Sequence, residues 1–167
     1  MNNISFRVIT EDNDIRTIAE LADQIWHEHY TGIISQQQID YMVRLYQSPP
    51  AIKEQIRKEK YQYWMMTSLD NVPVGYMATQ VCQDHIFLSK LYIVCTHRGL
   101  GYGSQAIKKI AEVAKENGFD KIRLGVNRDN TESLAVYEKW GFKKIDVIIK
   151  DIGGGFVMDD FILQKNL

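Results

Sequence analysis

A glycine-rich stretch at residues 98–104 (RGLGYGS) has the composition of a phosphate-binding turn. It lies between a segment typical of a strand and an amphipathic segment typical of a helix. Glycine costs about 1 kcal/mol relative to alanine inside a helix, so the cluster indicates that its backbone must approach another group closely. The first N–H groups of a helix lack partners within it and attract anions. We therefore expect an anion here, with Arg98 adding charge; glycines that only allow close packing are the alternative.

Two nucleotide-binding patterns come close to this stretch. A nucleoside-triphosphate loop needs a lysine and then serine or threonine after its last glycine, and that pair is missing. A dinucleotide turn fits better, because Gly101, Gly103 and Ala106 satisfy G-x-G-x-x-A. Its context does not fit, because the next predicted strand ends in residues 126–128 (VNR) and not in the acid that would hold a ribose.

Asn130 and Tyr137 form a second candidate pair. They are seven residues apart in a predicted helix, which is about two turns, so they lie on one face and could contact one ligand. Asn130 could also be a helix N-cap, and Tyr137 could pack in the core.

Residues 26–46 (WHEHYTGIISQQQIDYMVRLY) are rich in aromatic side chains. Those that could wall a pocket are Trp26, Tyr30, Tyr41 and Tyr46. Aromatic faces attract cations, and Glu28 and Asp40 would add carboxylates, so a cationic amine would suit this region. Packing of two helices against each other is the alternative explanation of the aromatic residues.

Metal binding is not indicated by the sequence. His27 and His29 are two residues apart and would diverge by about 200° on a helix. Cys82 and Cys95, the two cysteines of the chain, lack the spacing of metal ligands.

The overall composition fits one globular domain. The chain has 167 residues with 20 basic and 21 acidic side chains, so we expect neither nucleic-acid nor membrane binding. No apolar run approaches the roughly 18 residues of a membrane span. The first residues (MNNISFRVIT) lack a signal-peptide pattern, which predicts a cytoplasmic protein with reduced thiols.

The hydrophobic pattern predicts a single α/β domain on a mixed sheet. Strands are expected at 4–9, 61–69, 72–81, 86–94, 120–126, 142–150 and 155–164. Helices are expected at 13–26 (with Asn13 or Asp14 as N-cap), at 36–47, at 51–60, from the glycine turn to Gly118, and at 130–140. The helix before residues 120–126 should connect two parallel strands.

Residues 98–103 (RGLGYG) resemble the Arg/Gln-x-x-Gly-x-Gly/Ala pyrophosphate loop of the GNAT superfamily of N-acetyltransferases, which use acetyl-CoA. A downstream stretch is similar to the Asn-x-x-Ala/Ser-x-x-x-Tyr segment of that family and its following Gly-Phe. The matching residues are Asn130, Ser133, Tyr137, Gly141 and Phe142. The matches lie within residues 88–145, and Cys95 stands where the family commonly has proline.

The resemblance implies a single-domain fold over residues 1–167, with a mixed, mostly antiparallel sheet of about seven strands flanked by four or five helices. It implies an acceptor-side region at about 10–60 and an acetyl-CoA core at about 86–145. Backbone groups of the 98–104 turn would hold the pyrophosphate, and a strand edge would pair with the pantetheine arm. The implied cofactor-binding residues are Leu91, Tyr92, Ile93, Arg98, Gly99, Leu100, Gly101, Tyr102, Gly103, Ser104 and Asn130.

The resemblance also implies direct attack of a neutral amine on the thioester. The Ile93 N–H would stabilise the oxyanion, and Tyr137 would protonate the leaving thiolate as general acid. The expected acceptor is a polyamine, another small amine or a peptide amine, in a monomer or homodimer without metal. The base that deprotonates the amine is not assigned; Glu28, Asp84 and His85 are chemically suitable. A non-catalytic acyl-CoA-binding regulatory module is the alternative function, with a dinucleotide oxidoreductase a more distant one.

Overall fold

A central seven-stranded sheet forms the frame of the structure, a computed structural model that describes residues 3–167. The strands are β1 (Ser5–Val8), β2 (Gln62–Thr67), β3 (Pro73–Val81), β4 (Ile86–Ile93), β5 (Lys121–Asn127), β6 (Lys143–Gly153) and β7 (Phe156–Asn166). The helices are α1 (Asp12–Tyr30), α2 (Gln36–Tyr46), α3 (Pro49–Arg57), α4 (Tyr102–Glu116) and α5 (Thr131–Lys139), with a 3-10 turn at Cys95–His97. The strand order is β1-β2-β3-β4-β5-β7-β6, and only the β4–β5 pair is parallel among these described strands. The predicted mixed, mostly antiparallel α/β sheet is confirmed.

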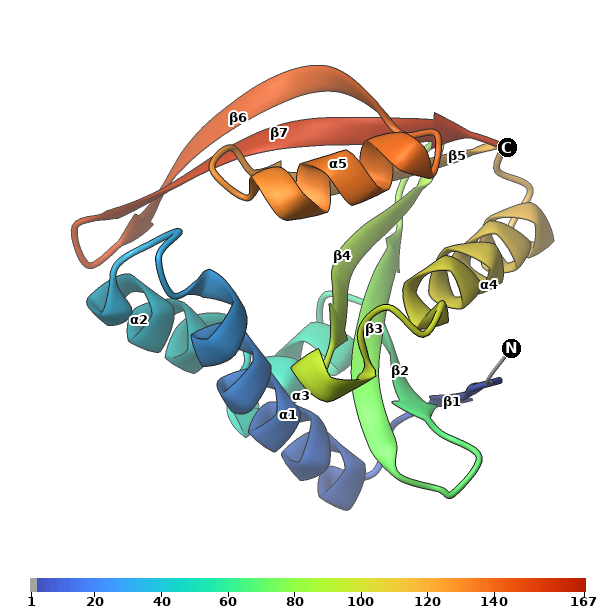
Figure 1. The fold of residues 1–167 in the computed structure, drawn as a ribbon, viewed down its shortest axis with the longest axis horizontal. Helices are drawn as coiled ribbons and strands as arrows, with labels where there is room; N and C mark the ends of the chain where they lie inside the picture. The colour runs from blue at the N-terminus through green and yellow to red at the C-terminus, as the bar shows by residue number, and fades with distance from the viewer. Residues whose placement is uncertain (1–2) are drawn as a thin grey trace.

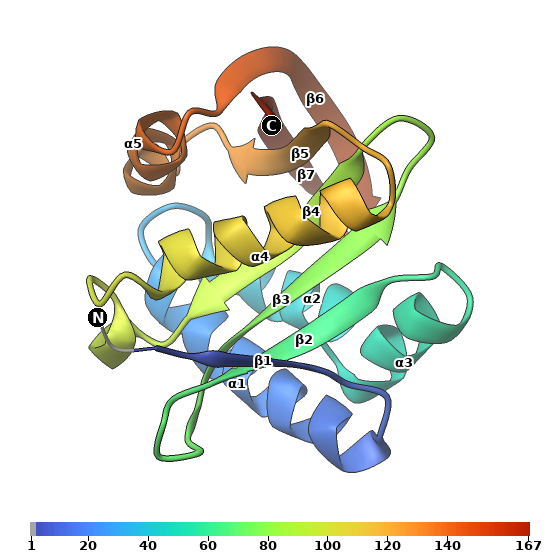
Figure 2. The same cartoon turned by 90° about the vertical axis from the view of Figure 1, so that its right-hand side faces the viewer.

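Helices cover both faces of the sheet. In Figures 1 and 2, α1, α2 and α3 lie on one face of β2–β4 and α4 lies on the other. α1 buries apolar residues at helical spacing, namely Ile15, Ile18, Ala22 and Ile25. α4 buries Ala106, Ile107, Ile110 and Ala114 in the same way. These apolar stripes explain why both segments are helices that pack on the sheet.

The sheet opens between β4 and β5. The two strands pair only from Ile86 opposite Ile122 to Leu88 opposite Leu124. Both strands then continue, β4 to Ile93 and β5 to Asn127, without further pairing to each other. The facing edges of these two strand ends are therefore free for other partners.

A bulge in β4 coincides with this opening. Ala78 of β3 pairs with Lys90 and Thr79 pairs with Leu88, so Ser89 is the extra residue. A bulge bends its strand and resets the alternation of side chains between the two faces. Leu88 and Lys90, which would share a face in a regular strand, therefore lie on different faces of β4.

Most predicted elements are confirmed, and the differences from the prediction lie at the ends of the elements. The first helix begins at Asp12 after Glu11, which makes no side-chain cap, so the prediction of Asn13 or Asp14 as N-cap was wrong. The third helix begins at Pro49 and not at residue 51, because proline is favoured in a first helical turn. β6 runs to Gly153 because its hairpin with β7 pairs almost to the glycine turn, and β7 runs to Asn166 because its last residues pair with β5. Within residues 3–167, no helix has both the length and the apolarity to cross a membrane.

Candidate active site

The glycine turn before α4 exposes its backbone. Gly99 and Gly101 have positive φ angles of 77° and 82°, a conformation that side chains with a Cβ rarely adopt. A Cβ on Gly99 would meet nothing within 4 Å, so close packing does not explain that glycine. No side chain caps the start of α4. The first N–H groups of the helix are thus available to an anion, together with the positive end of the helix dipole.

Gly103 has a different reason to be glycine. A Cβ at this position would lie 2.6 Å from the Trp140 ring. The start of α4 therefore packs against the end of α5 only because residue 103 has no side chain. The packing explanation of the glycine cluster holds for Gly103, and the ligand explanation remains for Gly99 and Gly101.

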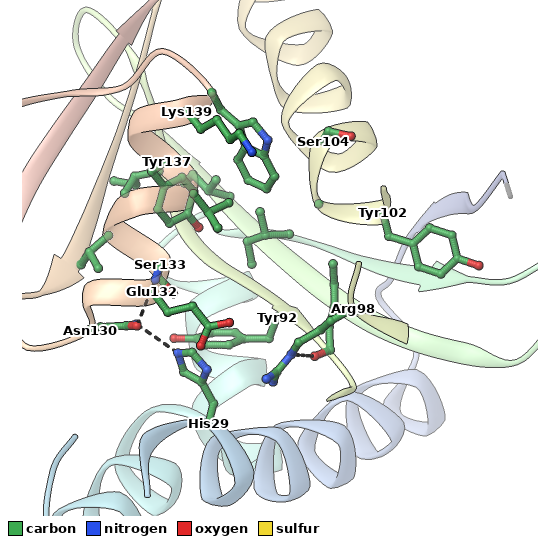
Figure 3. A pocket seen from close by; sticks show the side chains of 18 of the residues that line it. His29, Tyr92, Arg98, Tyr102, Ser104, Asn130, Glu132, Ser133, Tyr137 and Lys139 are labelled. Carbon is green, nitrogen blue, oxygen red and sulfur yellow. Dashed lines mark hydrogen bonds between the residues drawn. The ribbon is translucent and has the colours of Figure 1, made fainter. Parts of the chain in front are cut away.

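The turn opens into a first cavity of about 630 Å³, which lies over the gap between β4 and β5. It is lined by residues of β4, α4, β5 and α5 and by the end of α1 (Figure 3). The sequence-predicted residues in its lining are Leu91, Tyr92, Ile93, Arg98, Gly99, Gly101, Tyr102, Gly103, Ser104, Asn130 and Tyr137. Leu100 is not in this lining, and 41% of its surface is exposed.

The end of β4 presents backbone groups to this cavity. The Val94 N–H donates to the Val74 carbonyl of β3 at 3.0 Å, so the Ile93 N–H, one residue earlier, points the other way, into the gap. The Ile93 carbonyl accepts a hydrogen bond from Nε of Arg98 at 3.0 Å. Arg98 makes no ion pair with the described residues, and its guanidinium lies at the cavity in Figure 3. The Ile93 N–H and the guanidinium of Arg98, whose charge has no ion-pair partner among the described residues, thus flank the opening.

Tyr137 reaches the cavity from α5. Its ring packs edge-on against Trp140 at 5.7 Å and against Phe142 at 5.4 Å, measured between ring centroids. Figure 3 shows the hydroxyl on the cavity side of this packing. Burial raises the pKa of Tyr137 above its usual value, so the phenol keeps its proton at neutral pH. Core packing and a position suited to proton donation therefore coexist at this residue.

Asn130 links α5 to α1. Its side-chain oxygen accepts from the Ser133 N–H at 3.3 Å, so the predicted N-cap is present. Its amide nitrogen donates to Nε2 of His29 at 3.0 Å, which requires a neutral imidazole with its proton on Nδ1. Burial, and then the charge of Arg98, lower the pKa of His29 and favour that neutral form. Sequence reasoning missed His29, because nothing local indicates a partner 101 residues away.

A second cavity of about 520 Å³ lies on the α1–α3 side of the same gap. Tyr30, Ser89, Tyr92 and Gly125 line both cavities, so the two spaces meet at the point where the strands separate. The hydroxyls of Tyr30 and Tyr92 lie 3.0 Å apart. Because of the bulge at Ser89, Lys90 lines the second cavity while Leu88 and Leu91 line the first.

The second cavity combines aromatic and charged side chains. Its aromatic residues are Trp26, Tyr30, Tyr46, Tyr61, Phe87 and Tyr92. Its charged residues are Glu54, Glu59, Lys90, Lys150 and Asp160. Burial lowers the pKa of Lys90 to about 7 and raises the pKa of Asp160 to about 6. Neither residue was predicted, because a single charged residue within a strand pattern gives no sign of which face it occupies.

Several predicted acceptor-side residues lie elsewhere. Trp26, Tyr30 and Tyr46 do line the second cavity, but Tyr41 donates its hydroxyl to the Ile152 carbonyl at 2.6 Å and lines neither cavity. Glu28 is exposed and accepts from Gln24. Asp40 is exposed and contacts Nε2 of His27 at 2.6 Å. The prediction that these two carboxylates flank the pocket was wrong, because they lie on outer faces of α1 and α2.

The suggested bases also lie outside both cavities. Asp84 and His85 contact each other at 2.7 Å in the turn before β4, where Lys121 and Arg123 also approach Asp84. This turn is at the opposite end of β4 from the glycine turn. With Glu28 on the surface, none of the three candidates reaches the cavities. Among residues 3–167 there is also no group of three or more potential metal ligands.

Comparison with known proteins agrees with this geometry. The sequence model of the acetyltransferase (GNAT) family matches residues 19–142, which include the glycine turn and Tyr137. A spermidine N(1)-acetyltransferase from Thermoplasma acidophilum is 24% identical over 155 residues, covering 91% of this chain and 91% of that protein. The PaiA N-acetyltransferase of Thermoplasma acidophilum, solved with coenzyme A, aligns over 99% of both chains with a TM-score of 0.81 and 23% identity. A GCN5-related N-acetyltransferase from Rhodopseudomonas palustris aligns over 100% of this chain and 98% of that chain, with a TM-score of 0.81 and 17% identity.

Proposed function

This chain belongs to the GNAT family of acetyltransferases and is an acetyl-CoA-dependent acyltransferase, and we propose that its acceptor is a cationic aliphatic amine of the polyamine class. Acetyl-CoA would occupy the first cavity and the amine the second. The observation that carries this proposal is that the two cavities meet at Tyr30, Ser89, Tyr92 and Gly125. A thioester carbonyl placed at that junction can be attacked from the opposite side of the sheet.

The charge of the second cavity favours a cation. Glu54, Glu59 and Asp160 contribute carboxylates, and Glu54 shares its charge with Lys58 at 3.0 Å. Lys150, which is exposed, and Lys90 oppose them, and Lys90 does so only in part because its pKa of about 7 leaves it partly neutral. The six aromatic side chains add ring faces, which attract ammonium groups. The similarity to a spermidine N(1)-acetyltransferase supports the same class of acceptor.

The first cavity fits the parts of acetyl-CoA in order. The N–H groups from Gly99 to Ser104, with Arg98 beside them, suit the pyrophosphate. The open edge of β4 from Leu91 to Ile93 suits the amides of the pantetheine arm, which would pair with it as a strand does. The Ile93 N–H then lies where it can stabilise the oxyanion of the tetrahedral intermediate. This division assigns acetyl-CoA to residues of about 86–145 and the acceptor chiefly to about 10–60, with added residues from β4, β6 and β7.

Tyr137 is the proposed general acid. Its raised pKa keeps the hydroxyl protonated until negative charge develops on the departing sulfur. A free thiol has a pKa near 8.5, so full transfer from a tyrosine is favourable only if the phenolate is reprotonated in the same step. The attacking nitrogen of the acceptor must lose a proton as the amide forms, and it can give that proton to the phenolate of Tyr137.

The choice of acceptor is tested by comparing spermidine with a neutral-tailed amine of similar length. We expect wild type to prefer spermidine, and a Glu54→Gln, Glu59→Gln double variant to raise its KM about three- to tenfold, because each partly exposed carboxylate contributes modestly. The neutral-tailed amine should be affected little. Steady-state release of the coenzyme A thiol measures both rates.

A Glu28→Gln, Asp40→Asn double variant is the matched control, because it removes the same total charge outside the cavities. It should leave spermidine kinetics unchanged. Equal rates for the two amines in wild type, or an equal effect of both double variants, would contradict a cationic acceptor in the second cavity.

A further inference from the structure

Asp160 lies at the boundary between the two cavities. It is on β7, opposite Asn127 of β5 and Ile148 of β6, and it lines the second cavity. A Cβ built on Gly125 would be 3.5 Å from Oδ2 of Asp160. Gly125 lines both cavities. Because Gly125 has no side chain, no side chain at residue 125 separates the carboxylate of Asp160 from the junction of the two cavities. This is the place where an amine must be to attack a thioester in the gap.

The carboxylate of Asp160 is not used by the fold. Among residues 3–167 it makes no hydrogen bond or ion pair, although it is partly buried. Its neighbour Asp159 points to the opposite face of β7 and pairs with Arg128 at 2.9 Å. A carboxylate that faces a cavity and has no protein partner is free to bind a ligand there.

The surroundings of Asp160 weaken its acidity without neutralising its charge at physiological pH. Burial raises its pKa to about 6, and repulsion from Asp159 adds to the shift. The other ionisable groups that share its cavity or lie beside it come from every surrounding element: Tyr30 from α1, Tyr46 from α2, Glu54 from α3, Glu59 and Tyr61 from the segment after α3, Lys90 and Tyr92 from β4, Lys150 from β6, and Asp159 with its partner Arg128. At pH 7 to 8 the carboxylate is thus ionised, and it binds a proton about a hundredfold more strongly than an ordinary aspartate.

We propose that Asp160 is the base that takes the first proton from the acceptor ammonium. This assignment rests on the proposed function, because it requires a cationic amine in the second cavity. An alkyl ammonium has a pKa near 10.4 and arrives charged, so one N–H bond must break before its lone pair can attack. Of the carboxylates in this cavity, Asp160 is the one beside Gly125, at the junction with the first cavity.

The proton balance closes with two side chains. The ammonium gives one proton to Asp160, and the resulting amine forms a C–N bond with the thioester carbonyl carbon. The C–S bond then breaks, Tyr137 gives its proton to the sulfur, and the second proton of the nitrogen restores the Tyr137 hydroxyl. Asp160 releases its proton to solvent. The products are the N-acetylated amine, coenzyme A with a free thiol and one proton.

The test is the pH dependence of kcat in an Asp160→Asn variant, with Asp159→Asn as the matched control. Wild-type kcat should rise through a pKa of about 6 and then level off. The Asp160→Asn variant should lose about 10²-fold in kcat for spermidine near pH 7, and its rate should keep rising as the amine itself deprotonates. Asp159→Asn should keep the wild-type plateau of kcat, and its profile should shift only slightly to lower pH because the repulsion from Asp159 is lost. Acetyl-CoA affinity, measured on the same preparations, should match wild type in both variants, and thermal unfolding should show that both are folded.

A weakly basic acceptor gives a second readout that a structural role would not move. A fluorinated ethylamine that is already neutral at pH 7 needs no first deprotonation, so Asp160→Asn should slow its acetylation far less than that of spermidine. An unchanged pH profile, a change in KM alone, or an equal loss for both amines would each overturn the assignment. An Asp160→Ala variant whose activity is not restored by added formate would also contradict it. If wild type acetylates neither amine, the proposed function fails and the base assignment fails with it.

Discussion

The two cavities are built from different parts of the chain. The first is made largely of backbone: two left-handed glycines, the uncapped start of α4 and the open edge of β4. The second is made of side chains from α1, α2, α3, β4, β6 and β7. Backbone groups are the same in every protein and suit one common ligand, whereas side chains can change without loss of fold. Under the proposed assignment of acetyl-CoA and the amine, cofactor binding depends on backbone conformation and acceptor choice depends on side-chain composition.

The largest expected effect comes from Tyr137, the proposed general acid in the first cavity. Tyr137→Phe should lower kcat by roughly 10²-fold, because the departing sulfur loses its proton donor. The Kd for acetyl-CoA should stay within about twofold, since the backbone binds it. Steady-state assays of thiol release measure kcat, and calorimetry measures the Kd for acetyl-CoA. Tyr41→Phe, outside both cavities, is the control. Full activity of Tyr137→Phe would show that Tyr137 only packs in the core and does not act as the general acid.

The next effect tests whether the backbone conformation itself binds acetyl-CoA. Gly101→Ala should weaken acetyl-CoA binding at least tenfold, about 1.4 kcal/mol, because alanine resists the left-handed φ of 82°. Gly118→Ala is a matched control at the other end of α4, with a φ of 78° and no atom within 4 Å of a new Cβ. Both variants should lose similar stability. If calorimetry gives Gly101→Ala and Gly118→Ala the same affinity for acetyl-CoA, the glycine turn is not part of the binding site.

A smaller effect separates the packing glycine from the conformational ones. Gly103→Ala should lower the free energy of unfolding by about 1 kcal/mol, because the new methyl group would press on Trp140. In a Trp140→Leu background the same substitution should cost much less. Urea unfolding of the four proteins gives this coupling, and purely additive costs would contradict the close contact.

The smallest effect concerns the contact between His29 and Asn130. The folded-state pKa of His29 lies below the unfolded value of about 6.5, so its stabilising contribution is present above that pH. That contribution is lost as the pH falls through the lowered pKa. The drop in thermal midpoint between about pH 7.5 and pH 5 should therefore be smaller in His29→Gln than in wild type. His97→Gln is the control, and an identical drop in His29→Gln would contradict a buried neutral imidazole.

Most of the residues expected at the cofactor site line the first cavity, because the sequence features that indicate them are local. Three glycines before an apolar helical stripe indicate a bare helix start without knowledge of the fold. The order of strands and helices follows from periodicity in the same way. The role of Gly103 was the exception, since it depends on Trp140 in a different helix.

The second cavity could not be predicted in the same detail. The bulge at Ser89 resets the side-chain alternation of β4, so the face occupied by Lys90 cannot be read from a regular period of two. Asp160 reaches the junction because it lies opposite Asn127 of β5, diagonally across from Gly125, which has no side chain. Glu28 and Asp40 shared the right chemistry, but helix orientation placed them outside the cavity. Such positions depend on pairing between segments far apart in the chain.

We propose that the two cavities form one continuous site across the gap between β4 and β5. A conjugate that joins the sulfur of coenzyme A to a spermidine nitrogen through an acetyl linker tests this directly. Calorimetry should show that the conjugate binds at least about 10²-fold more tightly than coenzyme A alone, because both cavities are filled at once. The gain should shrink in the Glu54→Gln, Glu59→Gln variant. A conjugate that binds no more tightly than coenzyme A would show that the second cavity does not receive the acceptor.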